Sequence, residues 1–288
     1  MNQKAFLAKY NASCAEFAKT GLDWVELEAI GDHYRQIRPR LERILGALAE
    51  EFRTAEKVHT VKARTKDPEH LLEKIIRKRV QCPDLAIDSS NYQAIITDLI
   101  GLRVVHLFKE DWVIIDEFIR QNWEQLEQPM ANVRHGDKLK LIEGFRSRGL
   151  TIVEHPYGYR SLHYLIGSRP GEEEYVAEVQ MRTIFEEGWS EIDHTVRYPY
   201  DIDNPILSDY LVIFNRLAGS ADEMCSYVRF LSQKLHRLRR EQLDEVAEKH
   251  EFVEEMKNAI TQLDIAESKK ADLKKRLEIL EQRFLLRT

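Results

Sequence analysis

The residues from Tyr175 to Thr183, with the sequence YVAEVQMRT, place apolar side chains at every second position and polar ones between them from Glu178 onward. This period of two predicts a β-strand with one apolar face and one polar face. On the polar face, Glu178, Gln180 and Arg182 follow one another at a repeat of about 7 Å. A carboxylate there could bind a hard cation, and the arginine could contact a phosphate. The same pattern also fits an antiparallel strand whose polar face contacts only solvent.

The composition is that of a globular chain with long exposed helices. Of 288 residues, 43% are hydrophobic, enough for a core, and 32% are charged. The net charge of -6 disfavours non-specific binding to nucleic acid but allows a local basic patch. Cys14, Cys82 and Cys225 lack metal-ligand spacing and are expected to be free thiols in a reducing cytosol. Without an apolar run of about 20 residues or a signal pattern, we expect a soluble cytoplasmic protein with no membrane partner.

Helical periodicity dominates both ends of the chain. From Asn2 to about Lys57, apolar side chains recur at three- and four-residue spacing, without a catalytic pattern. From Pro205 onward, apolar stripes with the same spacing predict an antiparallel helical hairpin or coiled coil. Strands and helices alternate between these two regions. The predicted domains are N-terminal helices at 1–56, a strand-and-helix domain at 57–202 and a C-terminal helical extension at 203–288.

A group of cations follows the first predicted strand of the middle domain, at residues 57–64. An Asp-Pro pair then opens a helix, because aspartate is a good N-cap and proline suits the first helical position. Arg64, Lys66 and Lys74 would converge at this strand-to-helix junction, where free backbone amides already favour an anion. A triphosphate could bind there. Alternatively, these cations belong to the solvated face of a basic helix.

A second junction carries a carboxylate and a guanidinium. A helix beginning near Asn91 is followed by Gly101 and by a strand from Leu102 to Phe108 that is apolar enough to be buried. Asp98 lies just before this joint, and Arg103 lies at the start of the strand. The two side chains could form a structural salt bridge, or they could hold a metal ion and a phosphate.

The remaining polar features lie between this strand and the strand at 175–183. Residues 127–148 show little periodicity and carry several cations, which predicts a basic loop that could contact an anionic ligand. A Tyr-Gly-Tyr turn follows, and it can present Tyr159 as a ring on which a base stacks. The next strand should form a hairpin with 175–183, which brings His163 toward the face that carries Glu178.

Taken together, these central segments resemble the synthetase domain of the RelA/SpoT family, the alarmone synthetases or GTP pyrophosphokinases. The resemblance covers about residues 55 to 200 and rests on five short motifs, each weak alone but specific in this order and spacing. The motifs are Arg64-x-Lys66 with Lys74, Asp98-x-x-Gly101-Leu102-Arg103, Gly158-Tyr159-Arg160-Ser161-Leu162-His163, Glu178-x-Gln180-x-Arg182-Thr183, and Trp189 with His194. Since no second set of enzymatic motifs lies upstream, the chain resembles a small, synthetase-only member.

The resemblance implies an α+β fold, with a nucleotidyltransferase-like mixed β-sheet flanked by helices. It implies transfer of pyrophosphate from ATP to the 3'-hydroxyl of GDP or GTP, which makes (p)ppGpp-type alarmones in stringent-response signalling. Asp98 and Glu178 would hold Mg²⁺, and Glu178 would also activate the hydroxyl. The implied catalytic residues are Glu178, Asp98 and Arg64, and the implied ATP-binding residues are Arg64, Lys66, Lys74 and Arg103.

The implied acceptor site departs from the family pattern. Tyr159 would stack on the acceptor base and His163 would contact its phosphates, with Arg148 and His155 also in the site. The family usually has a lysine at the position of His155 and a Lys-Asp-Tyr sequence at the position that begins with Arg148. Since histidine is only partly charged near pH 7, it would hold a 5'-diphosphate less firmly than lysine. Donor and metal motifs are therefore intact, whereas acceptor recognition is altered.

Two alternatives follow from the same residues. A toxin-type relative would pyrophosphorylate the 3' end of tRNA or make adenosine alarmones, and it would hold RNA through residues 134–148 or the C-terminal lysines and arginines. A catalytically silent module would bind nucleotide in the same pocket, but it would have no need of Asp98 and Glu178. The C-terminal stripes would fold back on the synthetase domain or pair between subunits, which predicts a homo-oligomer or a regulatory partner.

Overall fold

The structure, a computed structural model, describes residues 2–10, 13–155, 157–171, 173–197, 204–262 and 266–285. It contains two compact units, residues 1–225 and 226–288. The predicted domain boundary between residues 202 and 203 lies outside the described residues. The division into three domains therefore stays a prediction.

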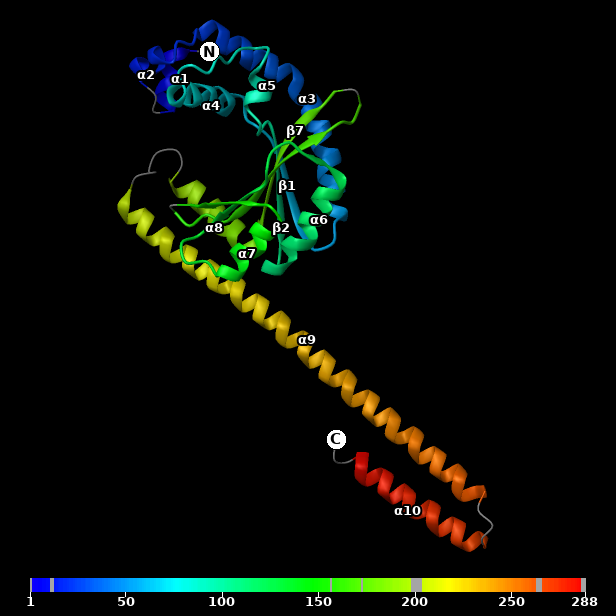
Figure 1. The fold of residues 1–288 in the computed structure, drawn as a ribbon. Helices are drawn as coiled ribbons and strands as arrows, with labels where there is room; N and C mark the ends of the chain where they lie inside the picture. The colour runs from blue at the N-terminus through cyan, green and yellow to red at the C-terminus, as the bar shows by residue number, and fades with distance from the viewer. Residues whose placement is uncertain are drawn as a thin grey trace. The chain divides into compact units, whose positions relative to one another are not determined.

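A seven-stranded mixed sheet forms the centre of the first unit (Figure 1). Its strands are β1 (Val58–Thr65), β2 (Ile100–His106), β3 (Glu124–Gln125), β4 (Met130–Val133), β5 (Thr151–Glu154), β6 (Ser161–Ser168) and β7 (Tyr175–Thr183). They lie in the order β1-β2-β7-β6-β4-β5, and β3 pairs with β6 beside this path. The pairs β2–β7 and β4–β5 are parallel, and the other pairs are antiparallel. The predicted α+β class, a mixed sheet with flanking helices, is confirmed.

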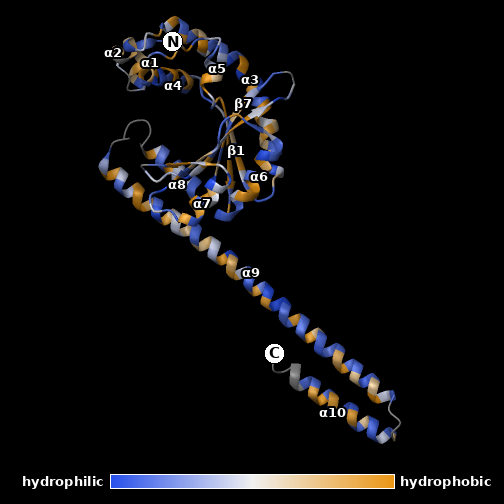
Figure 2. Ribbon diagram, in the orientation of Figure 1, coloured by the Kyte–Doolittle hydropathy of each residue, from blue (hydrophilic) through white to orange (hydrophobic). Residues whose placement is uncertain are grey.

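The strand predicted at 175–183 is β7, and it lies between β2 and β6. Its hairpin with β6 is also confirmed, because residues 162–168 of β6 pair antiparallel with residues 175–181 of β7. Ala177, Val179 and Met181 are at most 1% exposed and belong to one core with side chains of α3 (Trp24–Thr54) and α6 (Trp112–Asn122). The apolar face of β7 is thus buried, and its polar face is left for other contacts. Figure 2 shows hydrophobic and hydrophilic residues mixed along the strands of the sheet.

The other helices that lie wholly within the first unit are α1 (Gln3–Lys9), α2 (Cys14–Lys19), α4 (Pro68–Gln81), α5 (Tyr92–Ile95), α7 (Leu139–Ser147) and α8 (Ile184–Arg197), with a 3-10 turn at Lys109–Asp111. Helix α4 begins as its sequence predicts, since the Asp67 carboxylate accepts hydrogen bonds from the backbone N–H groups of Glu69 and His70. This cap holds the cations of α4 next to the end of β1.

The prediction of a single basic loop at residues 127–148 is wrong. The segment contains β4, which pairs with β5 and β6, and the helix α7. Phe145 of α7 packs edge-on against Trp112 of α6, with ring centroids 4.8 Å apart. Four strand residues and nine helical residues are too few for either periodicity to stand out in the sequence.

The chain continues as α9 (Pro205–Gln262) and α10 (Glu267–Leu285). Within residues 226–288, α10 runs back beside the end of α9, and Glu281 is hydrogen-bonded to His250 at 2.8 Å and to Lys257 at 3.4 Å (Figure 1). Val253 and Leu277 are 8% and 9% exposed. The predicted antiparallel helical hairpin is therefore confirmed within this unit. Among the described residues, no helix is both long and apolar enough to cross a membrane.

Candidate functional site

The three adjacent strands β1, β2 and β7 bring predicted site residues onto one face of the sheet. Gly101 of β2 lies opposite Arg64 of β1 and opposite Glu178 of β7. Two residues further along β2, Arg103 lies opposite Gln180 of β7. Since residues two apart on a strand share a face, the two arginines and Glu178 lie on the same side. Gly101 has no side chain, so the space between Arg64 and Glu178 is left open.

A pocket of about 260 Å³ lies on this face. Its lining includes Asp98, which precedes β2, and Glu191 and His194 of α8. Burial, helped by the charges of Arg64 and Arg103, lowers the pKa of His194. The sequence motifs around Asp98, Arg103, Glu178 and His194 therefore meet in one pocket, although they are far apart along the chain.

Asp98 is held by the two lysines of the first motif. Its Oδ2 atom accepts hydrogen bonds from Lys66 Nζ at 2.7 Å and from Lys74 Nζ at 2.9 Å. Its Oδ1 atom is buried and has no hydrogen-bond partner among the described residues. Burial alone would raise the pKa of this carboxyl, but the lysines outweigh it and lower the pKa below its usual value. Asp98 is therefore ionised at neutral pH, with one oxygen still available to a ligand.

Two of the carboxylates that line the pocket, Asp98 and Glu178, suit a hard cation. Glu178 uses Oε1 to accept a hydrogen bond from Gln180 Nε2 at 2.6 Å, and Asp98 has its unused Oδ1. Mg²⁺ prefers oxygen ligands and commonly binds one or two carboxylates together with substrate phosphates. Within the described part of the chain, no three His, Cys, Asp or Glu side chains gather as a complete metal centre. Phosphates and water would have to complete the coordination of such an ion.

Two carboxylates on α8 were missed by the sequence motifs. Glu187 is 5% exposed and lies 2.8 Å from Lys62 Nζ, 3.4 Å from Arg103 and 3.4 Å from Arg182. Glu191 forms a second ion pair with Arg103. These carboxylates hold the cations of the sheet in place from the helix side. Their four-residue spacing on a helix that directly follows β7 was the available signal, since it places both on one helix face.

Tyr159 lies in a group of ring and guanidinium contacts at the start of β6. Its hydroxyl accepts a hydrogen bond from Arg182 Nη2 at 2.8 Å and is hydrogen-bonded to His163 Nε2 at 3.2 Å. The guanidinium carbon of Arg182 is 5.1 Å from the Tyr159 ring centroid, and the ring of His155 is 5.3 Å away. Burial raises the pKa of Tyr159, although Arg182 opposes the effect. Tyr159, His163 and His155 are thus brought together.

His163 is the member of this group closest to the predicted metal residues. It lies opposite Gln180 in the β6–β7 pair, and its Nδ1 is 3.7 Å from Glu178 Oε1. Burial lowers the pKa of His163 to about 4, although the Glu178 charge acts in the other direction. The imidazole is therefore neutral at pH 7. It could contact a phosphate by donating a hydrogen bond, but it would bring no positive charge.

Arg148 does not join the Tyr159 group. Its guanidinium contacts α6, where it donates to Asp116 at 3.1 Å and to Glu117 at 2.7 Å. Asp116 is fully buried and also accepts a hydrogen bond from Tyr164. Since Tyr164 follows His163 on β6, their side chains point to opposite faces of the sheet. The structure therefore places Arg148 on the face away from the pocket.

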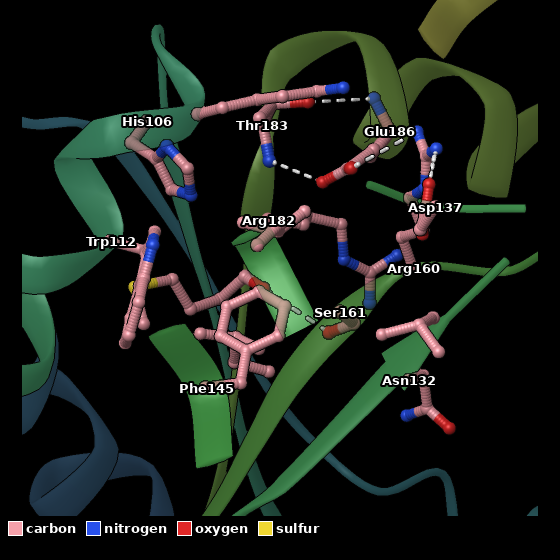
Figure 3. A pocket seen from close by; sticks show the side chains of 15 residues that line it. His106, Trp112, Asn132, Asp137, Phe145, Arg160, Ser161, Arg182, Thr183 and Glu186 are labelled. Atoms are coloured by element: carbon pink, nitrogen blue, oxygen red, sulfur yellow. Dashed lines mark hydrogen bonds and ion pairs between the residues drawn. The ribbon is translucent and has the colours of Figure 1, made fainter. Parts of the chain in front are cut away.

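A smaller cavity of about 40 Å³ lies beside the end of β7 (Figure 3). At its rim, Thr183 and Glu186 form a capping box at the start of α8. The Thr183 backbone N–H donates to Glu186 Oε2 at 3.0 Å, and the Glu186 N–H donates to Thr183 Oγ1 at 3.2 Å. Arg160 and Asp137 form an ion pair on the same rim. The capping box fixes where α8 begins, and so where Glu187 and Glu191 meet the sheet.

Asp222 of α9 is a buried acid next to this capping box. It is 0% exposed, and its Oδ2 accepts a hydrogen bond from Thr183 Oγ1 at 3.0 Å. Burial and the nearby charge of Glu186 raise the pKa of Asp222 from 3.8 to about 7. An acid whose pKa is higher in the folded state stabilises that state when protonated. Its contribution is complete below about pH 4 and is lost as the pH rises through 7.

We therefore expect Asp222→Asn to stabilise the first unit at alkaline pH. The amide can still accept the Thr183 bond but carries no charge, so the gain over wild type should be small near pH 4 and should rise to about 4 kcal/mol near pH 8. Urea unfolding followed by tryptophan fluorescence measures the difference, because all four tryptophans lie in residues 1–225. An equal effect of the substitution at both pH values would contradict the raised pKa.

Comparison with known proteins places the chain in a class. Residues 63–203 match the family model described as a region found in RelA / SpoT proteins. The GTP pyrophosphokinase YwaC of Bacillus subtilis (strain 168) is 24% identical over 187 residues, 64% of this chain and 74% of that protein. The GTP pyrophosphokinase YjbM of the same organism is 25% identical over 150 residues, 51% of this chain and 60% of that protein.

A solved structure supports the fold independently. A GTP pyrophosphokinase family protein from Streptococcus pneumoniae aligns with a TM-score of 0.51 and 22% identity, over 75% of this chain and 98% of that chain. At this identity the likeness bears on the fold alone. All five motifs lie within the matched residues 63–203. Residues 63–203 therefore form a RelA/SpoT-family region, and the two curated relatives that this chain resembles are named GTP pyrophosphokinases.

Proposed function

We propose that this protein transfers the pyrophosphate group of ATP to the 3'-hydroxyl of GDP or GTP. The observation that carries the proposal is one pocket that combines Arg64 and Arg103 with the carboxylates Asp98 and Glu178. Phosphoryl-type transfer requires positioning and charge neutralisation more than covalent help from the protein. A pocket with paired cations and carboxylates offers both. The two curated relatives, named as GTP pyrophosphokinases, support the reaction class.

In this proposal the phosphates of ATP lie against Arg64, Arg103, Lys66 and Lys74. In the free protein both lysines are held by Asp98 Oδ2. A triphosphate carries more charge than one carboxylate, so it would draw the two ammonium groups away from Asp98. Asp98 would then be able to bind a metal ion with oxygens that no lysine occupies. Mg²⁺ held by Asp98 and Glu178 would supply charge neutralisation on the phosphates.

Glu178 would also accept the proton of the acceptor hydroxyl. Its oxygen is oriented by the Gln180 amide, which donates to it at 2.6 Å. The neighbouring His163 is neutral at pH 7 because burial lowers its pKa to about 4. It would therefore help to position the acceptor without neutralising the Glu178 charge. The acceptor base would stack on the face of Tyr159 that Arg182 does not cover, with His155 at its edge.

The proposal is tested by a transfer assay with ATP labelled on the γ-phosphate. Purified protein and Mg²⁺ are mixed separately with GDP, GTP, GMP, ADP and deacylated tRNA, and a parallel set contains a chelator. Label on GDP or GTP that disappears with the chelator is the expected result. Label on tRNA or ADP alone would replace the proposal with the toxin-type reaction. Absence of label on every acceptor would favour the nucleotide-binding module.

The ATP side of the pocket yields a prediction with a matched control. Lys74→Ala removes one of the two ammonium groups next to Asp98, so we expect the KM for ATP to rise about tenfold, with the KM for GDP unchanged. Lys78→Ala removes the same charge one turn along α4, where the ammonium contacts the Ile95 carbonyl at 3.3 Å. That variant should keep the wild-type KM for ATP. Equal effects of both substitutions would point to a general loss of positive charge instead of a specific phosphate contact.

A further inference from the structure

Helix α9 contacts the turn that carries Tyr159. Asn215 of α9 is 7% exposed, and its Nδ2 donates a hydrogen bond to the backbone carbonyl of Gly158 at 2.9 Å. Its Oδ1 accepts a hydrogen bond from Arg134 Nη1 at 3.2 Å. A buried amide with both ends engaged has one orientation. One of its partners is the residue directly before Tyr159.

The turn is also packed closely against this amide. Gly158 has a φ of 74°, in the left-handed region that side chains disfavour. A Cβ atom at this position would meet Asn215 Oδ1 and Arg134 Cγ, each at 3.2 Å. The backbone at Gly158 therefore needs glycine both for its conformation and for the approach of α9.

The residue after Tyr159 is held as well. Arg160 is 8% exposed, and its Nε donates to Asp137 Oδ2 at 2.9 Å. The same Asp137 oxygen accepts the backbone N–H of Arg134 at 2.8 Å. Helix α9 comes close here too, since a Cβ at Gly219 would meet Arg160 Nη1 at 2.9 Å. Tyr159 thus lies between two residues that are both fixed by buried polar contacts.

The part of α9 around Asn215 is anchored on both sides. The Trp189 indole Nε1 donates to the Leu211 carbonyl at 2.9 Å, one turn before Asn215. Thr183 donates to Asp222 at 3.0 Å, two turns after it. All of these residues belong to the unit formed by residues 1–225. Asn215 is therefore carried by a helix segment whose position against the sheet is set independently of the Gly158 contact.

We infer that Asn215 is a positioning residue for the acceptor: it holds the Gly158 carbonyl so that the ring of Tyr159 faces the acceptor base. The inference rests on the proposed function and extends it to α9, which carries none of the sequence motifs. The side-chain hydrogen bonds of Asn215 go to Gly158 and Arg134, on the acceptor side. Loss of Asn215 therefore acts on acceptor binding and leaves ATP binding as it is.

Two substitutions separate the two bonds of the amide. Asn215→Asp keeps the size and the contact with Arg134 but cannot donate to the Gly158 carbonyl, whereas Asn215→Ala loses both bonds. With ATP and GDP as substrates, both variants should raise the KM for GDP about tenfold and leave the KM for ATP within about twofold of wild type. Ser220→Ala is the control, because within the described part of the chain this exposed hydroxyl hydrogen-bonds only to the Arg216 carbonyl of its own helix. It should behave as wild type.

A variant of the turn keeps the inference testable if the Asn215 variants do not fold. Gly158→Ala disturbs the same junction from the other side and should raise the KM for GDP in the same way. In a double variant the two effects should not add, because both act through one contact. Unchanged KM for GDP in folded Asn215→Asp, or equal rises in the KM for ATP and for GDP, would overturn the inference.

Failure of the proposed function has a different signature. If the wild type transfers no label to a guanine nucleotide, the proposed reaction is wrong whatever Asn215 does. Calorimetric titration of wild type and Asn215→Asp with GDP then tests the positioning role by itself. About tenfold weaker binding to the variant would support it, and equal binding would refute it.

Discussion

Replacing Glu178 by glutamine should lower kcat for pyrophosphate transfer by about 10²–10³-fold, with little change in the KM for ATP. Glutamine keeps the size of the side chain, and its carbonyl oxygen can still accept the 2.6 Å hydrogen bond from Gln180. The substitution therefore removes the negative charge and the basicity without reshaping the pocket. Both proposed roles of Glu178, as a metal ligand and as the group that takes the hydroxyl proton, depend on these two properties.

The control for charge is Glu174→Gln, four residues earlier. Glu174 pairs with Arg169 at 2.8 Å and does not line the pocket that contains Glu178. We expect wild-type kinetics for this variant, measured with labelled ATP at saturating GDP. Undiminished transfer by Glu178→Gln would mean that the reaction centre lies elsewhere on the sheet.

The second large effect is expected at Asp98. Asp98→Asn should lower kcat about 100-fold, because the metal position loses one of its two carboxylates. The KM for ATP should stay the same or fall, since Lys66 and Lys74 lose the carboxylate that holds them at 2.7 and 2.9 Å and become available to the phosphates. A fall in kcat without a rise in the KM for ATP distinguishes Asp98 from a residue that only binds ATP.

Two measurements complete the test of Asp98. The Mg²⁺ concentration needed for half-maximal rate should rise in Asp98→Asn, and Asp84→Asn, an exposed aspartate on the loop after α4, should match wild type in both readouts. If Asp98→Asn instead raises the KM for ATP and keeps kcat, Asp98 serves only to orient the two lysines. The metal position would then have to be assigned to Glu178 and other groups.

The acceptor site in the structure carries less positive charge than its sequence motifs predict. His163 and His155 were the expected contacts for acceptor phosphates, but the low pKa of His163 leaves it neutral at pH 7. Arg148 is engaged with Asp116 and Glu117 on the other face of the sheet. Among the described residues near Tyr159, Arg182 is the guanidinium in direct contact with the ring. An acceptor bound there would be recognised by stacking and hydrogen bonds more than by a cluster of cations.

The central strands and their polar face could be predicted because each is a local pattern. Alternation along residues 175–183 specifies both the strand and the side of the sheet on which Glu178 lies. The Asp-Pro start of α4 likewise specifies where Lys74 lies relative to β1. By contrast, β4 and α7 were missed because segments of four and nine residues carry too little periodicity.

The sequence by itself determined the strands β1, β2, β6 and β7, the β6–β7 hairpin, the helical regions at both ends of the chain and the residue types of the five motifs. These features depend on neighbours along the chain. Only the tertiary structure decided which helix covers which face. It placed Glu187 of α8 against the cations of the sheet and Asn215 of α9 against Gly158, and it took Arg148 to the opposite face. These outcomes depend on packing between segments distant in sequence, and burial then sets the charge of His163, which no local pattern records.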